Sequence, residues 1–199
     1  SYRYLLGCVY RDLGEAPHAI DCYQQAADCA DTLDSDCDYH TLVTIYGQIA
    51  YLFRDQFLPD DEIAALKAVA KNAHLDRDTL TEIIAIYQLA SPYFMKSDTD
   101  SVLIVEKQAR ELFLQHSRKD YASQSVLGTL RIALDRHDLP EAERLLTIYR
   151  NESGLFDSKG ELIRISAYNV DKGMYLTLSG KLDSAQYYFR KAIAWGQYE

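Results

Sequence analysis

The chain has 199 residues, of which 48% are hydrophobic, and this is enough apolar material to bury a core. Its formal net charge is −9, with no cluster of Lys or Arg, so its surface repels phosphate backbones and we expect no nucleic-acid binding. No apolar run reaches the ~20 residues of a membrane helix, so we expect no direct insertion into a membrane. We interpret the chain as a segment of a longer protein, because it begins and ends inside helical patterns.

The spacing of apolar residues and caps predicts helices along the whole chain. Only four Pro and nine Gly interrupt a composition rich in helix-forming residues. Acidic and capping residues mark several starts, such as Asp98, Pro140-Glu141 and Asp183-Ser184. The predicted helices cover residues 2–13, 17–32, 40–56, 60–74, 78–95, 99–116, 119–136, 139–151, 160–179 and 182–197.

The first and last helix pairs share one pattern of small and large residues. It combines small residues in both helices, a glycine in the turn and a bulky residue in the second helix. The first copy is Gly7, Tyr10, Gly14, Ala19, Tyr23 and Ala26. The last copy keeps every offset, with Gly173, Leu176, Gly180, Ala185, Phe189 and Ala192. Agreement over so many positions indicates an internal repeat.

Three weaker copies lie between these two. The residues equivalent to Gly7 are Ala50, Ala90, Leu130 and Gly173, so the successive spacings are 43, 40, 40 and 43 residues. In the third copy Glu106 stands where an aromatic residue is expected. The period exceeds the usual ~34 residues of such helix pairs, and we expect the extra residues in the loops between pairs.

These residue types have a packing function. Small side chains let two antiparallel helices approach closely, and bulky neighbours fill the grooves beside the contact. One pair leaves an apolar face uncovered, so successive pairs must stack. We therefore predict an all-α fold, a right-handed superhelical α-solenoid of about five helix hairpins.

The quoted residues resemble the tetratricopeptide repeat family over essentially the whole chain. The resemblance divides residues 1–199, as one solenoid, into repeats of approximately 1–36, 40–76, 78–117, 119–154 and 160–199. The 40-residue spacing and the stretch from Ile45 to Pro59 are similar to tetratricopeptide regions of Bacteroidetes-type envelope and signalling proteins. That narrower resemblance favours the bacterial cell envelope over the cytoplasm as the location of the protein that contains this chain.

The family resemblance implies a concave groove lined by the first helices, which accepts a peptide or a partner helix. Helical spacing around the packed positions places ten residues on that face: Tyr4, Arg11, Asp12, Tyr51, Arg54, Asp55, Tyr87, Phe94, Arg131 and Asp135. Aromatic and Arg residues are enriched in binding hot spots. We expect the three arginines to hold an extended segment that carries carboxylates. The alternative is that Arg11 and Arg54 pair with nearby acids and that Phe94 belongs to the core.

Motifs for chemistry were not found, and we expect no catalytic residues, metal or cofactor. The four cysteines contain no CxxC, and the five histidines are scattered. The stretch Asp34-Ser-Asp36-Cys-Asp38 resembles the start of a calcium loop, but Tyr39 replaces the required glycine. We interpret it as an acidic loop that caps the next helix.

The sequence therefore predicts a non-catalytic scaffold that binds another protein or peptide. Two alternatives remain: a sensor or regulatory segment whose effector region lies outside this chain, and an enzyme with an unusual helical site. The apolar ends at Tyr2–Leu6 and Tyr187–Trp195 also predict a possible homodimer. A light-scattering mass of one chain at high concentration would contradict it.

Overall fold

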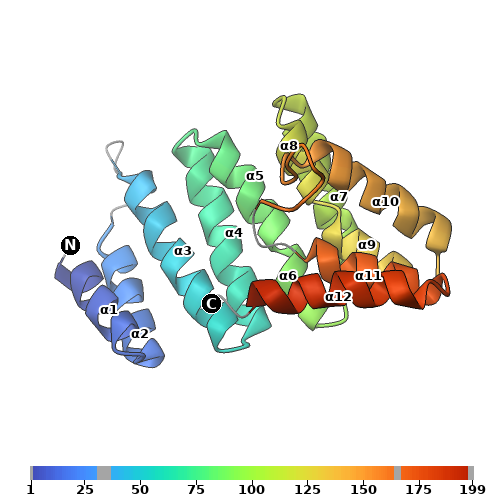
Figure 1. Cartoon of the computed structure of the whole chain (residues 1–199). Coiled ribbons are helices and arrows are strands. Elements are labelled where there is room, and N and C mark those ends of the chain that lie inside the picture. The colour runs from blue at the N-terminus through green and yellow to red at the C-terminus, as the bar shows by residue number, and fades with distance from the viewer. Residues whose placement is uncertain (1, 31–36, 164–166, 197–199) are drawn as a thin grey trace. The chain divides into compact units, whose positions relative to one another are not determined.

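The computed structural model describes residues 2–30, 37–163 and 167–196, and within them nearly all regular structure is helical. Figure 1 shows successive helices paired as hairpins, which confirms the predicted all-α fold. The chain divides into two compact units, residues 1–105 and 106–199. The single solenoid over 1–199 stays a prediction.

The first unit contains two complete hairpins and the start of a third. Helix α1 packs against α2, and α3 packs against α4. The bounds are α1 (Tyr2–Asp12), α2 (Ala16–Asp28), α3 (Tyr39–Asp55), α4 (Pro59–Leu75), α5 (Thr79–Gln88), α6 (Ala90–Met95) and α7 (Thr99–Gln115), the last of which continues into the second unit.

The second unit contains two further hairpins. Helix α10 packs against α8 and α9, and α11 packs against α12. The bounds are α8 (Lys119–Gln124), α9 (Leu127–Asp135), α10 (Leu139–Glu152), α11 (Tyr168–Leu178) and α12 (Leu182–Gly196).

A turn of one geometry recurs every twenty residues through the middle of the chain. Each turn places one residue in the left-handed region, where φ lies between 56° and 60°: Phe57, Arg77, Ser97, Ser117 and His137. The next amide donates to the carbonyl five residues earlier, as Leu58 does to Phe53 at 2.9 Å. This bond closes a Schellman cap. Gly14 and Gly180 occupy the same place in the outer hairpins.

In the middle of the chain this regular turn corrects the prediction that extra residues lie in the loops between pairs, whereas the long connection between α10 (ending at Glu152) and α11 (beginning at Tyr168) agrees with that prediction. Helices α3, α4 and α7 each have 17 residues. The turns at 56–58, 76–78 and 96–98 are equally short, whether they lie within a hairpin or between two hairpins. In the middle of the chain the longer period therefore comes from longer helices, which present more surface for stacking.

Asp side chains cap the N-termini of α3, α5 and α7. Asp38, Asp78 and Asp98 accept the backbone N–H three residues on, at 2.9–3.1 Å. The hydroxyls of Thr41, Thr81 and Ser101 bond to the same carboxylates and hold the pKa of each Asp below its usual value. The predicted cap at the end of the acidic loop is thus confirmed for Asp38; Asp34 and Asp36 lie outside the described residues.

Small residues face bulky ones at the centre of the outer hairpins, as the repeat predicts. A Cβ at Gly7 would lie 2.6 Å from the Tyr23 ring, and a Cβ at Gly173 would lie 2.6 Å from the Phe189 ring. Tyr23 is fully buried, so its ring packs directly on the backbone of α1. Equal sequence offsets therefore produce the same contact in both hairpins.

Two predicted helices are broken, which corrects their ranges. The helix predicted over 78–95 divides at Leu89. Pro92 causes this break, because a proline ring clashes with the carbonyl four residues earlier, here that of Gln88, and has no N–H to donate.

The helix predicted over 119–136 divides at Ser125 and Val126. Hydroxyls of Ser123 and Ser125 bond to carbonyls three residues earlier, and such bonds compete with the helical pattern. The new N-terminus of α9 is satisfied by Glu106 of α7, which accepts the N–H groups of Gly128 at 2.8 Å and Thr129 at 2.7 Å. The residue that replaces the expected aromatic is thus a helix cap supplied by another helix.

The helix predicted over 160–179 begins only at Tyr168. Before it, Phe156 and Leu162 form an isolated antiparallel bridge. The Asp157 carboxylate accepts the N–H groups of Lys159 and Glu161, both at 2.8 Å, and Gly160 has a φ of 78°. These turn residues favour a small β-hairpin over continuation of a helix.

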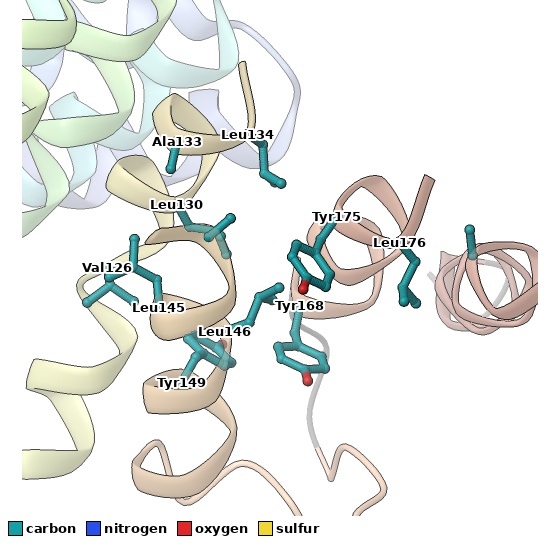
Figure 2. Close-up of a cluster of buried hydrophobic side chains, with 12 residues drawn as sticks. Val126, Leu130, Ala133, Leu134, Leu145, Leu146, Tyr149, Tyr168, Tyr175 and Leu176 are labelled. Carbon is teal, nitrogen blue, oxygen red and sulfur yellow. The ribbon is translucent and has the colours of Figure 1, made fainter. Parts of the chain in front are cut away.

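The core of the second unit joins α9, α10 and α11. Figure 2 shows Leu146 of α10 facing Tyr168 and Tyr175 of α11, with Leu130 and Leu134 above them on α9. Tyr149 and Tyr168 stack with centroids 5.7 Å apart. The β-hairpin contributes Phe156, which meets Tyr168 edge-on at 4.9 Å.

Candidate peptide-binding site

Four of the ten predicted groove residues line one recess in the first unit. It is open, measures about 260 Å³ and lies between the end of α1 and the end of α3. Arg11 and Asp12 come from α1, and Tyr51 and Asp55 come from α3. Arg11-Asp12 and Arg54-Asp55 lie at equivalent positions of the repeat, four and five residues after Gly7 and Ala50, and stacking of the first two hairpins brings residues of both pairs together.

Arg11 is held in place by its neighbours but keeps donors for a ligand. Its Nε and one terminal nitrogen donate to Asp12 at 2.9 and 2.8 Å, and the other terminal nitrogen donates to Gln48 at 2.7 Å. A guanidinium has five N–H groups, so these bonds leave two. The Tyr51 side chain, 57% exposed, adds an apolar surface beside it.

Arg54 and Arg131 each pair with a buried carboxylate. Arg54 Nε donates to Glu62 at 2.6 Å, and Arg131 Nε donates to Asp171 at 3.3 Å. Both acids are fully buried, and each has a second oxygen without a hydrogen bond from the described residues. Both arginines stay about two-fifths exposed, at 41% and 42%. The acids thus anchor Nε and leave the terminal nitrogens able to donate, although the paired charge weakens attraction for an anion.

The other predicted residues lie outside the recess. Tyr4 packs on Tyr23, with ring centroids 5.5 Å apart. Tyr87 and Phe94 are half-buried on α5 and α6, and Asp135 is exposed at the end of α9. Arg131 and Asp135 belong to the second unit.

The partners of two of the arginines were not predicted from the sequence. Gln48 lies two residues before Ala50, and Asp171 lies two residues before Gly173. Each accepts a hydrogen bond from an arginine on the first helix of the preceding hairpin: Gln48 accepts from Arg11, and Asp171 accepts from Arg131. A polar residue at this repeat position is the signal that could have revealed the pairing.

Asp171 gives the second unit a testable pH dependence. Burial raises its pKa above the usual 3.8, and Arg131 opposes that shift. A carboxyl group with a raised pKa stabilises the fold most when protonated, so its contribution is present below pH 3.8 and is lost as pH rises through the raised pKa. We expect the wild type to lose free energy of unfolding relative to Asp171→Asn as pH rises from that value toward neutrality.

Urea denaturation over a pH series measures this difference, with the exposed Asp135→Asn as the control for loss of one carboxylate. A constant difference between wild type and Asp171→Asn would contradict the expectation. A difference that grows in favour of the wild type would show that Arg131 outweighs burial.

Sites for metal chemistry are absent from the described part of the chain: no three His, Cys, Asp or Glu side chains there are arranged to hold an ion. Cys8, Cys22 and Cys29 are free thiols. No helix within the described ranges combines the length and the apolar character needed to cross a bilayer.

Comparison with known sequences gives no match: no family model and no curated protein matches this chain. Solved structures do match. Aspartyl phosphate phosphatase F from Bacillus subtilis has a TM-score of 0.75 at 15% identity, over 99% of this chain and 50% of that one. BtubC from P. vanneervenii has a TM-score of 0.68 at 16% identity, over 96% and 77% of the two chains.

A third match identifies the type of repeat. The tetratricopeptide-like repeats of a kinesin light chain from Podosopora anserina have a TM-score of 0.64 at 12% identity, over 97% of this chain and 92% of that one. The chain thus has an α-helical repeat fold of the tetratricopeptide-like type. None of these neighbours supports the narrower Bacteroidetes-type resemblance.

Proposed function

We propose that this chain is a non-catalytic scaffold that binds an extended segment of another protein along its first helices. The recess of Arg11, Asp12, Tyr51 and Asp55 carries the proposal, because it joins two hairpins and combines an exposed aromatic ring with a guanidinium that can still donate. Aromatic and Arg side chains of this kind dominate binding energies at protein interfaces.

The proposed segment carries a carboxylate that binds Arg11. Arg54, anchored by Glu62, is proposed to bind a further carboxylate in the first unit, and Arg131, anchored by Asp171, is proposed to bind one in the second unit. A carboxylate and a guanidinium form charge-assisted hydrogen bonds, which are stronger than neutral ones.

The test begins with capture of the partner. A photoreactive amino acid at position 51 would crosslink to a segment seated in the recess, and mass spectrometry would identify it. We then expect Arg11→Ala and Tyr51→Ala each to weaken binding of that segment by about tenfold. Titration calorimetry measures the affinity, and circular dichroism checks that each variant is folded.

Arg3→Ala is the matched control, because Arg3 is an exposed arginine on the same helix. Arg54 and Arg131 are better replaced by Lys than by Ala, since Lys keeps a cation beside each buried acid. Full affinity in the Arg11 and Tyr51 variants would sink the proposal.

A sensor or regulatory segment is the second candidate. Sequence beyond Glu199 that encodes an effector region would favour it over the scaffold. The exposed side chains of Tyr2, Leu5 and Val9 on α1, and of Leu13 directly after it, support the proposed homodimer, which stays a prediction.

A further inference from the structure

The β-hairpin between α10 and α11 builds a recess that the repeat itself does not contain. Its residues Lys159, Gly160 and Glu161 form one wall, and the start of α11 and the middle of α12 form the others. The hairpin is held by its bridge and by the Asp157 bonds. The recess measures about 140 Å³.

A second, more open recess of about 400 Å³ adjoins the first and shares Arg150 and Tyr168 with it. The cationic side chains that line the two are Arg150, Lys159, Lys172 and Lys191. Among the described residues that line them, the only carboxylate is Glu161, which pairs with Lys191. The lining of the two recesses is therefore net positive, although the chain as a whole has a formal net charge of −9.

Arg150 lies at the centre of this cationic surface. A Cβ at Gly160 would lie 2.8 Å from its terminal nitrogen, so the guanidinium rests against the backbone of the hairpin. Burial lowers the pKa of Lys172, Glu143 opposes that shift, and the smaller effects of Arg150 and Lys181 lower the pKa further. Arg150 and Lys172 are therefore close enough to repel each other, and an anion between them would relieve that repulsion.

Aromatic rings surround the same centre. Tyr168 is buried, and Tyr188 meets it edge-on at 6.5 Å. Tyr187 is 51% exposed and carries Lys191 over its ring at 4.7 Å. A ligand bound here thus contacts both cations and aromatic rings. The cations suit the carboxylate of an acidic side chain, and the rings suit its methylene groups.

We propose that the two adjoining recesses bind an acidic segment of a partner protein. One carboxylate side chain binds Arg150, which lines both recesses, and Lys172 of the larger recess binds a second carboxylate. The smaller recess lies below the ~300 Å³ at which pockets for small organic ligands begin, which favours a single side chain over a cofactor. The positive surface complements an acidic peptide. The site is distinct from the Arg11 recess, which contains residues of α1 and α3.

The test uses the whole chain and a short acetylated, amidated peptide in which glutamate alternates with alanine. We expect chemical-shift changes at the amides of Gly160, Asn169 and Lys172 in NMR titrations. We expect Arg150→Gln with Lys172→Gln to weaken the affinity by about tenfold or more. The same peptide could also bind at the Arg11 recess, so the affinity of this site is fitted only to the shifts at Gly160, Asn169 and Lys172, and shifts at Arg11 and Tyr51 report the other site separately.

Lys107→Gln is the matched control, because Lys107 is exposed on α7 and lines neither recess. A glutamine version of the peptide controls for the carboxylate. Melting curves check the fold of each variant. The proposal is wrong if the peptide does not bind, if the glutamine peptide binds equally, or if Lys107→Gln weakens binding as much as the double variant. Binding to anionic vesicles or single-stranded DNA but not to the peptide would also overturn it.

Discussion

Gly7→Ala is expected to lower the free energy of unfolding by about 1–3 kcal/mol, the usual cost of overpacking a filled site. The new methyl group would lie 2.6 Å from Cε1 of the Tyr23 ring. Even Cγ, the ring atom that is bonded to Cβ of Tyr23, would be only 3.2 Å away. Tyr23 is fully buried and packs on Tyr4, so it has little room to move. The clash therefore outweighs the helix propensity that alanine gains over glycine, about 1 kcal/mol.

Gly47→Ala is the matched control. Gly47 also lies inside a helix, but apart from its chain neighbours and the backbone of its own helical turn, no atom of the described residues lies within 4 Å of a Cβ placed there. We expect this variant to be more stable than the wild type by about 0.4–1 kcal/mol. Urea denaturation measures both variants, and hydrogen exchange should locate the loss in Gly7→Ala to α1 and α2. Equal effects of the same sign at the two positions would refute the packing argument.

Glu106→Gln is expected to destabilise the second unit by about 1–3 kcal/mol, the cost of leaving a buried donor unsatisfied. The carboxylate accepts the N–H groups of Gly128 and Thr129 and the Thr129 hydroxyl, at 2.7–2.8 Å. An amide has one acceptor oxygen, so its NH₂ group would face one of these donors. Burial raises the pKa of Glu106, against the opposing bonds from Thr129 and Gly128.

Glu111→Gln is the corresponding control, because Glu111 is exposed on the same helix. We expect it to stay within about 0.5 kcal/mol of the wild type. Hydrogen exchange at Gly128 and Thr129 should accelerate in Glu106→Gln and not in Glu111→Gln. Unchanged protection of these two amides would show that Glu106 does not cap α9.

The two proposed sites differ in how the fold builds them. The Arg11 recess comes from stacking two ordinary hairpins, so its residues repeat along the chain. The Arg150 recess depends on the β-hairpin at residues 156–162, an addition between two repeats. Loops added to a regular scaffold often carry binding residues, because the scaffold holds them in place.

Local chemistry made much of the fold predictable from the sequence. Small and large residues at equal offsets predicted the contacts of Gly7 with Tyr23 and of Gly173 with Phe189, because helix packing depends on side-chain size at fixed helical positions. Pro92 was a visible signal for the break at Leu89, yet the apolar pattern continues across it. Arg77 and Ser117 also adopt the left-handed turn conformation, but neither is a glycine, so nothing in the sequence indicated that conformation.

The tertiary structure decided what the charged residues do. Helical spacing placed Arg54 and Arg131 on the predicted groove face, but it could not show that Glu62 and Asp171 would be buried beside them. In the sequence Glu106 only replaces an expected aromatic residue, and the tertiary structure shows that α9 begins against its carboxylate. The sequence by itself determined the repeat, its period and its close helix contacts, since these depend on neighbours within a hairpin. The Arg131–Asp171 pair, the Glu106 cap and both recesses join residues from different hairpins, and the Arg54–Glu62 pair joins the two helices of one hairpin, so only the packed chain brings these residues together.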